Sequence, residues 1–260
     1  MPADPALLVI GHGSRDHAGV AEYWRFVDQV ARATDAPVGG GFIELAEPDL
    51  DTAIDKLIAD GAERIVGVPL VLLGAGHMKL DGPAALDRGR RRHPHVHFDY
   101  GRALGIHPLV LDVAADRIPR DTDAVVVVGR GSSDPDANAD LFKIARLLQD
   151  ATGVPIVEPA FVSLAEPRVP AAIARCHRLG AASIAVVPYF LFTGVLVERI
   201  GEQARANGAV PHPHLGVDSR LVALVLERYR EALAGDAHMN CDGCKYRLAA
   251  AVHVHDHNTH

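Results

Sequence analysis

Three side chains able to bind a metal ion follow successive apolar runs of the sequence. His12 stands in the loop GHGS directly after the run LLVI, Glu44 lies in the segment FIEL, and His77 follows the run VPLVLL. Two neutral imidazoles and a carboxylate suit a borderline divalent ion such as Fe²⁺, Co²⁺, Ni²⁺ or Zn²⁺. Structural zinc normally takes four protein ligands. A set of two or three leaves positions open, as catalysis or the transfer of a metal requires.

The loop after His12 also carries groups suited to an anion. It leads into an expected helix, and the free backbone N–H groups at a helix start attract negative charge. Ser14 and Arg15 lie in the same loop. A metal ligand beside an anion-binding loop indicates a polyanionic substrate that takes up metal.

Apolar runs typical of strands alternate with amphipathic segments typical of helices. We expect strands at 7–10, 37–45 and 64–73 and helices at 20–33 and 49–62. This alternation predicts an α/β fold with a parallel sheet and right-handed crossovers. In the flavodoxin-like order 2-1-3 the three strands are neighbours, so their carboxyl ends would bring His12, Glu44 and His77 into one pocket.

The second half of the chain repeats the first. The matching pairs, in order, are GHGSRD (11–16) with GRGSSD (129–134), FIELAEPDL (42–50) with FVSLAEPRV (161–169), VPLVLLGAGHM (68–78) with VPYFLFTGVLV (187–197), and LGIHPLVLDVAADR (104–117) with LGVDSRLVALVLER (215–228). We therefore expect two tandem domains, each a parallel sheet flanked by helices, at 1–120 and 121–235. Residues 236–260 share no pattern with the repeat and form an appended tail rich in cysteine and histidine.

The second half has lost the candidate metal ligands. At the positions that match His12, Glu44 and His77 stand, respectively, Arg130, Ser163 and Leu196. The surrounding residues LAEP persist in both halves. Joint loss is expected when a duplicated fold keeps a single active centre, so we place the site in the first domain.

Composition narrows the class of protein. The hydrophobic content of 48% and the charged content of 23% are ordinary for a globular chain. The net charge of −7 argues against a nucleic-acid partner but leaves room for an anionic substrate held by a few arginines. Three cysteines do not make a secreted disulfide framework. With no signal peptide and no apolar stretch near the roughly 20 residues of a membrane span, we expect a cytoplasmic protein without a membrane partner.

The motifs GHGSR, FIELAEP and PLVLLGAGHMKLD together resemble those of the sirohydrochlorin chelatases, class II chelatases that need no ATP. The resemblance covers almost all of residues 6–233, duplication included, and points to the long two-domain cobalt-chelatase form. It implies a lyase that inserts Co²⁺ into sirohydrochlorin in cobalamin biosynthesis, with His12, His77 and Glu44 at the metal-insertion site. Sirohydrochlorin carries eight carboxylates, for which Ser14, Arg15 and Lys79 are candidate contacts. On spacing alone, Lys79 is better explained as a solvated residue at a helix start.

The tail adds a second match to the long cobalt chelatases. HMNCDGCKYR (238–247) contains their MxCxxC motif, which is linked there to an iron–sulfur centre. Cys241 and Cys244 supply two thiolates, which cannot complete a Cys₄ cluster site. A cluster shared by two chains, a site completed by histidines, a redox dithiol and a tail with reduced cysteines all stay open. The chain would accordingly be a monomer or a homodimer.

Other functions fit the sequence less well. Fe²⁺ insertion leading to sirohaem would use the same residues, and Ni²⁺ is a further candidate, because His and Glu ligands barely distinguish these metals. The histidine-rich end HVHDHNTH (253–260) suits a metal chaperone or storage protein, but such a protein would not need two α/β halves. A histidine phosphatase would carry an arginine where Gly11 stands. A dinucleotide-binding loop would carry a third glycine, which GHGSRD lacks.

Overall fold

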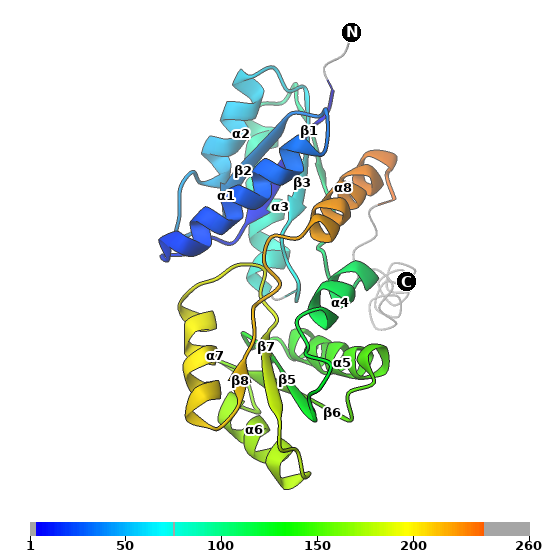
Figure 1. The fold of residues 1–260 in the computed structure, drawn as a ribbon. Coiled ribbons are helices and arrows are strands. Elements are labelled where there is room, and N and C mark those ends of the chain that lie inside the picture. The colour runs from blue at the N-terminus through cyan, green and yellow to red at the C-terminus, as the bar shows by residue number, and fades with distance from the viewer. Residues whose placement is uncertain (1–3, 75, 237–260) are drawn as a thin grey trace, which may run out of the picture.

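The computed structural model describes residues 4–74 and 76–236, the side chains of residues 76–80 excepted. Its strands form two parallel four-stranded sheets, in the orders β2-β1-β3-β4 and β6-β5-β7-β8 (Figure 1). The strands are β1 (Ala6–Gly11), β2 (Val38–Phe42), β3 (Arg64–Pro69), β4 (His97–Tyr100), β5 (Ala124–Gly129), β6 (Ile156–Phe161), β7 (Ile184–Pro188) and β8 (Val210–Pro211). The predicted 2-1-3 order and the two tandem α/β units are confirmed.

Helices cover both faces of each sheet. They are α1 (His17–Arg32), α2 (Leu50–Ala59), α3 (Gly76–Arg92), α4 (Pro108–Ala115), α5 (Pro135–Thr152), α6 (Val169–Arg178), α7 (Val195–Ala206) and α8 (Ser219–Ala234). Successive residues of β1 therefore enter different cores: Leu7 and Val9 pack on the face of α1, and Leu8 packs on the face of α2. Burial on both faces explains why this strand is apolar throughout.

Several predicted boundaries were wrong. The second strand, expected to run to residue 45, ends at Phe42. The first helix begins at His17 rather than Val20, because the Asp16 carboxylate accepts a bond from the Ala18 N–H at 2.9 Å and caps it. The third strand ends at Pro69 rather than at residue 73. Residues 70–72 are buried outside the strand, and Leu70 and Leu72 belong to a core that contains residues of both halves.

The two halves exchange their last helices. By sequence α8 belongs to the second repeat, but it packs against α1 and β3 of the first, and α4 packs against α5 and α8 (Figure 1). The Arg102 guanidinium makes two bonds to Glu231 of α8, at 3.0 and 2.7 Å. The Arg228 Nε donates to the Ala103 carbonyl at 3.2 Å. The repeats thus fold around a shared core.

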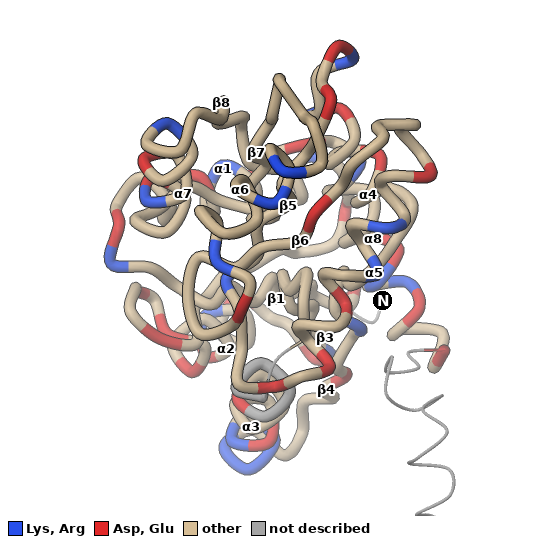
Figure 2. Tube along the Cα trace, turned by 90° about the horizontal axis from the view of Figure 1, so that it is seen from below, with Lys and Arg blue, Asp and Glu red and all other residues tan. Residues whose placement is uncertain are grey.

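Basic and acidic residues are interspersed along the chain (Figure 2). The arginine-rich end of α3 lies beside carboxylates: Arg88 and Arg92 both pair with Asp51, and Arg92 also pairs with Asp55. These cations are therefore balanced locally. Within the described residues, no helix is long and apolar enough to cross a bilayer.

Candidate metal site

The structure brings His12 and Glu44 together at the carboxyl end of the first sheet. Gly11 and Phe42 are paired in neighbouring strands, and the ladder continues beyond them with a bond from the Glu44 N–H to the His12 carbonyl at 3.1 Å. The His12 Nε2 lies 3.5 Å from the Glu44 Oε1. The imidazole is 35% exposed and the carboxylate 57% exposed, so both are open to an incoming ion.

Gly13 gives the loop its shape. Its φ of 96° lies in the left-handed region, and a Cβ there would stand 1.7 Å from the Glu44 carbonyl oxygen. The second half repeats this approach, since a Cβ on Gly131 would stand 2.1 Å from the Ser163 carbonyl oxygen. The same scaffold therefore presents an imidazole in one half and the Arg130 side chain in the other.

The predicted third ligand, His77, lies in the first turn of α3, the helix that follows β3. Strand β3 pairs with β1 on the side opposite to β2. The backbone of His77 is thus at the same end of the sheet as His12 and Glu44, while its side chain and that of Lys79 lie outside the described set. Among the side chains that the structure describes, no three His, Cys, Asp or Glu residues are grouped as metal ligands. Cys241 and Cys244 also lie outside the described residues.

Ser14 and Arg15 have different surroundings. The Ser14 Oγ accepts a bond from the Asp16 N–H at 3.0 Å, and Ser132 accepts the equivalent bond from Asp134 at 2.9 Å. This contact therefore belongs to the scaffold that both halves share. Arg15 is exposed, and within the described part of the chain no carboxylate is paired with it.

The second half contributes to the same region. A Cβ on Gly19 of α1 would stand 2.6 Å from the Thr193 carbonyl oxygen, and one on Gly129 would stand 3.4 Å from the Leu73 side chain. The segment after each third strand thus meets the first strand or helix of the opposite half. The carboxyl ends of the two sheets face each other (Figure 1), and a Cβ on Gly194 of the second half would stand 3.9 Å from the Ser14 Oγ, two residues after His12.

Two exposed leucines were not predicted from the sequence. Leu45 directly follows Glu44 and is 47% exposed, and Leu164 follows Ser163 and is 61% exposed. Both have positive φ, 66° and 54°, which is rare for leucine and is a form of strain often found at functional sites. The LAEP sequence common to both halves was the available signal.

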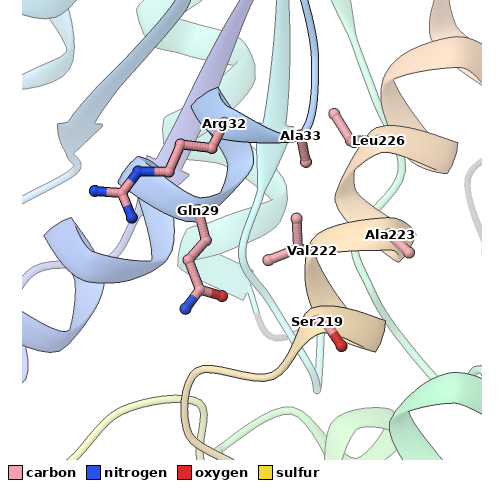
Figure 3. Close-up of a pocket in the computed structure, with 7 residues that line it drawn as sticks. All are labelled: Gln29, Arg32, Ala33, Ser219, Val222, Ala223 and Leu226. Atoms are coloured by element: carbon pink, nitrogen blue, oxygen red, sulfur yellow. The ribbon is translucent and has the colours of Figure 1, made fainter.

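Two grooves and a buried cysteine lie outside the candidate metal site. A groove of about 330 Å³ between α1 and α8 (Figure 3) is lined by Gln29, Arg32, Ala33, Ser219, Val222, Ala223 and Leu226. A second, of about 490 Å³, lies between α7 and the residues after β8, around His212, and burial lowers the pKa of that imidazole. Cys176 is a buried residue of α6, and burial raises the pKa of its thiol to about 11, as for a cysteine that packs in the core.

Comparison with known proteins gives the relatives of this chain. The CbiX family model matches residues 6–121 and, a second time, residues 124–232. A sirohydrochlorin cobaltochelatase of Priestia megaterium is 38% identical, over 97% of this chain and 88% of that protein. A sirohydrochlorin ferrochelatase of Bacillus subtilis strain 168 is 33% identical, over 94% of this chain and 98% of that protein.

Solved structures agree with these relatives. The sirohydrochlorin chelatase SirB from Bacillus subtilis subspecies spizizenii, in complex with cobalt, is similar with a TM-score of 0.77 and 31% identity. The match covers 88% of this chain and 95% of SirB. SirB from Bacillus subtilis with Fe³⁺ gives a TM-score of 0.78 and 32% identity, with the same coverage. The family model spans nearly the whole of both repeats, so the chain belongs to the CbiX family, that of the sirohydrochlorin chelatases.

Proposed function

We propose that the chain is a sirohydrochlorin cobaltochelatase, a lyase that inserts Co²⁺ into sirohydrochlorin without ATP in cobalamin biosynthesis. The observation that carries the proposal is the pair of His12 and Glu44, 3.5 Å apart and open to solvent at the carboxyl end of a parallel sheet. In this proposal the domain at 1–120 performs the reaction, and the degenerate repeat at 121–235 frames it.

The chemistry suits these groups. When M²⁺ enters the macrocycle, two pyrrole nitrogens form bonds to the metal and release their two protons. A neutral imidazole holds a divalent ion or accepts a proton near neutral pH, and a carboxylate can bind the ion or act as a general base. His12 and His77 share the metal-holding and proton-accepting roles, and Glu44 assists one or the other. The exposed imidazole and carboxylate then return the protons to water.

The remaining contacts would hold the macrocycle. Arg15, exposed and close to His12 in the chain, is the candidate partner for a carboxylate of the substrate, together with Ser14 and Lys79. The exposed side chain of Leu45 directly follows Glu44 in the chain and would lie against the face of the ring.

Cobalt is our choice of metal because of the MxCxxC motif in the tail and the cobaltochelatase of Priestia megaterium at 38% identity. The ferrochelatases at 33% identity support Fe²⁺ insertion as the second candidate. Cys241 and Cys244 provide half of the ligands of a Cys₄ cluster, so no step of the reaction is assigned to an iron–sulfur centre. Analysis of the purified chain for iron and acid-labile sulfide tests for such a centre and for a dimer that shares it.

The test is a set of anaerobic initial rates with sirohydrochlorin and Co²⁺, Fe²⁺ or Ni²⁺, followed by absorbance. We expect Co²⁺ to react fastest in the wild type, and His12→Ala and His77→Ala each to lose most of that rate. Wild-type rates in both variants would remove the proposed site. A faster reaction with Fe²⁺ would instead assign the chain to sirohaem synthesis.

A further inference from the structure

The carboxylate of Glu22 joins the two halves of the chain. Glu22 lies on α1, and its Oε2 accepts a bond from the Thr193 N–H at 2.7 Å and lies 2.9 Å from the His214 Nε2. Glu22 and His214 are shielded, with side chains 16% and 17% exposed. Arg25 lies 3.4 Å from Glu22, but its side chain is 66% exposed, so solvent weakens that pair. The shielded partners of this carboxylate both come from the second repeat.

The segment that Glu22 holds lies against the loop that carries His12. The approach of the Thr193 carbonyl to α1 leaves room for glycine alone at position 19, where a Cβ would stand 2.6 Å from the carbonyl oxygen. On the next residue, Gly194, a Cβ would stand 3.9 Å from the Ser14 Oγ and 3.7 Å from the Asp16 carboxylate. Thr193 and Gly194 thus contact the residues between His12 and the first turns of α1.

The residues at the matching positions of the other half show which parts of this contact the repeated fold itself does not require. Gly19 corresponds to Ala137, a buried residue of α5, so the helix itself accepts alanine at this place. His214 corresponds to Ala103. The contact of α1 with the second half therefore uses a glycine and a histidine that are absent from the matching positions, Ala137 of the second half and Ala103 of the first.

We propose that Glu22 is a positioning residue for metal insertion: through Thr193 and His214 it holds the second repeat against the loop that carries His12. This inference rests on the proposed function and extends it. Hydrogen bonds to a shielded carboxylate are stronger than those in water, so they fix the geometry of a contact. Because reacting groups must be placed to within a fraction of an ångström, a small shift of this loop reduces the rate of the chemical step more than the binding of the macrocycle.

Three variants on one helix test the inference by steady-state kinetics with Co²⁺ and by thermal unfolding. We expect Glu22→Ala to lower kcat about tenfold and to change KM by less than about twofold, since misplacement acts on the chemical step. Glu22→Gln keeps an acceptor oxygen for the Thr193 N–H and should recover most of kcat. Asp28→Ala removes an exposed carboxylate from the same helix and should behave as the wild type.

Gly19→Ala is an independent variant that leaves Glu22 in place. The added methyl group displaces the Thr193 carbonyl, while alanine favours the helix. We expect a fall in kcat like that of Glu22→Ala, and a changed visible absorption spectrum of Co²⁺ bound without the macrocycle. If Glu22→Ala fails to fold, Gly19→Ala and Glu22→Gln still decide the matter.

The possible failures are distinguishable. Wild-type kcat in both Glu22→Ala and Gly19→Ala overturns the inference, as does an equal loss in Glu22→Ala and Glu22→Gln. An inactive wild type overturns the proposed function instead. In that case the Co²⁺ spectrum of the variants still decides whether Glu22 positions the loop: a spectrum identical to that of the wild type rejects it.

Discussion

The His12 imidazole lies 3.5 Å from the Glu44 carboxylate, on two loops joined by a backbone hydrogen bond that the second repeat reproduces between Ser163 and Arg130. In the first half this bond runs from the Glu44 N–H to the His12 carbonyl at 3.1 Å, and in the second from the Ser163 N–H to the Arg130 carbonyl at 3.0 Å. The backbone of the site is therefore common to both halves, whereas its side chains are not. Side-chain identity, on a scaffold that both halves keep, is what separates them.

Gly13→Ala should remove most of the metal-insertion activity. A Cβ at this residue would overlap the Glu44 carbonyl oxygen, and its φ of 96° is strained for alanine, so the two loops must separate. Such backbone strain costs about 1–3 kcal/mol per residue, which chemical denaturation would detect. The insertion rate measured under conditions where the variant is folded should fall to the level of His12→Ala.

Gly131→Ala is the matched control, with a Cβ 2.1 Å from the Ser163 carbonyl oxygen and a φ of 86°. We expect a similar loss of stability with the kcat of the wild type per folded molecule. If the two variants lost activity equally, the reaction would not belong to the first half alone.

Much of the fold follows from the sequence. The alternation of buried strands and amphipathic helices predicted the parallel sheets, and the order 2-1-3 is that expected of a flavodoxin-like sheet. The fourth strand of each sheet, β4 and β8, was not predicted. It is short, and Val210 and His97 are exposed, so it lacks the continuous apolar run that marked the inner strands.

The exchanged helices and the contact of Glu22 were beyond the sequence. The repeat places α8 with the second domain, and nothing in its amphipathic pattern says which sheet its apolar face covers. The contact between Glu22 and His214 joins residues far apart in the chain, each with several surface roles open to it. By contrast, His12 and Glu44 were predicted to meet, because the ends of adjacent parallel strands lie at one edge.

Asp218→Asn should weaken the protein in a pH-dependent manner. Hydrogen bonds from Arg220 lower the pKa of the Asp218 carboxyl below its usual value, and this carboxylate also caps α8. Asparagine caps a helix as well as aspartate does, so the variant chiefly loses the charge interaction, about 1 kcal/mol at neutral pH.

The sign follows from the direction of that shift. The folded pKa is lower than the unfolded value of about 3.9, so the stabilisation is present above pH 4 and is lost as the pH falls through the folded pKa. Urea unfolding of wild type and Asp218→Asn should therefore give free energies of unfolding that differ at pH 7 and converge toward pH 2. A constant difference over that range would contradict the assignment.

Deletion of residues 237–260 should leave metal insertion intact. The proposed reaction uses residues of the first domain, whereas a metal chaperone would depend on the histidine-rich end of the tail. We expect the truncated chain to keep the kcat of the full chain with Co²⁺ and to bind fewer Co²⁺ ions in equilibrium dialysis. Cys241→Ser with Cys244→Ser separates the cysteines from the histidines. Loss of insertion on truncation would assign the tail a part in the reaction.

Transplanting the lost side chains should create a second metal site. Arg130→His, Ser163→Glu and Leu196→His together place the candidate ligands of the first half on the scaffold of the second, where Gly131 already has the required backbone. The two loops of the second half are joined by the same backbone hydrogen bond as those of the first. We therefore expect the triple variant to bind one more equivalent of Co²⁺ than the wild type, as measured by isothermal titration calorimetry. The control is Arg130→Ala with Ser163→Ala, which removes the native side chains and adds no ligand. An unchanged stoichiometry in a folded triple variant would mean that the scaffold alone does not set the ligand geometry.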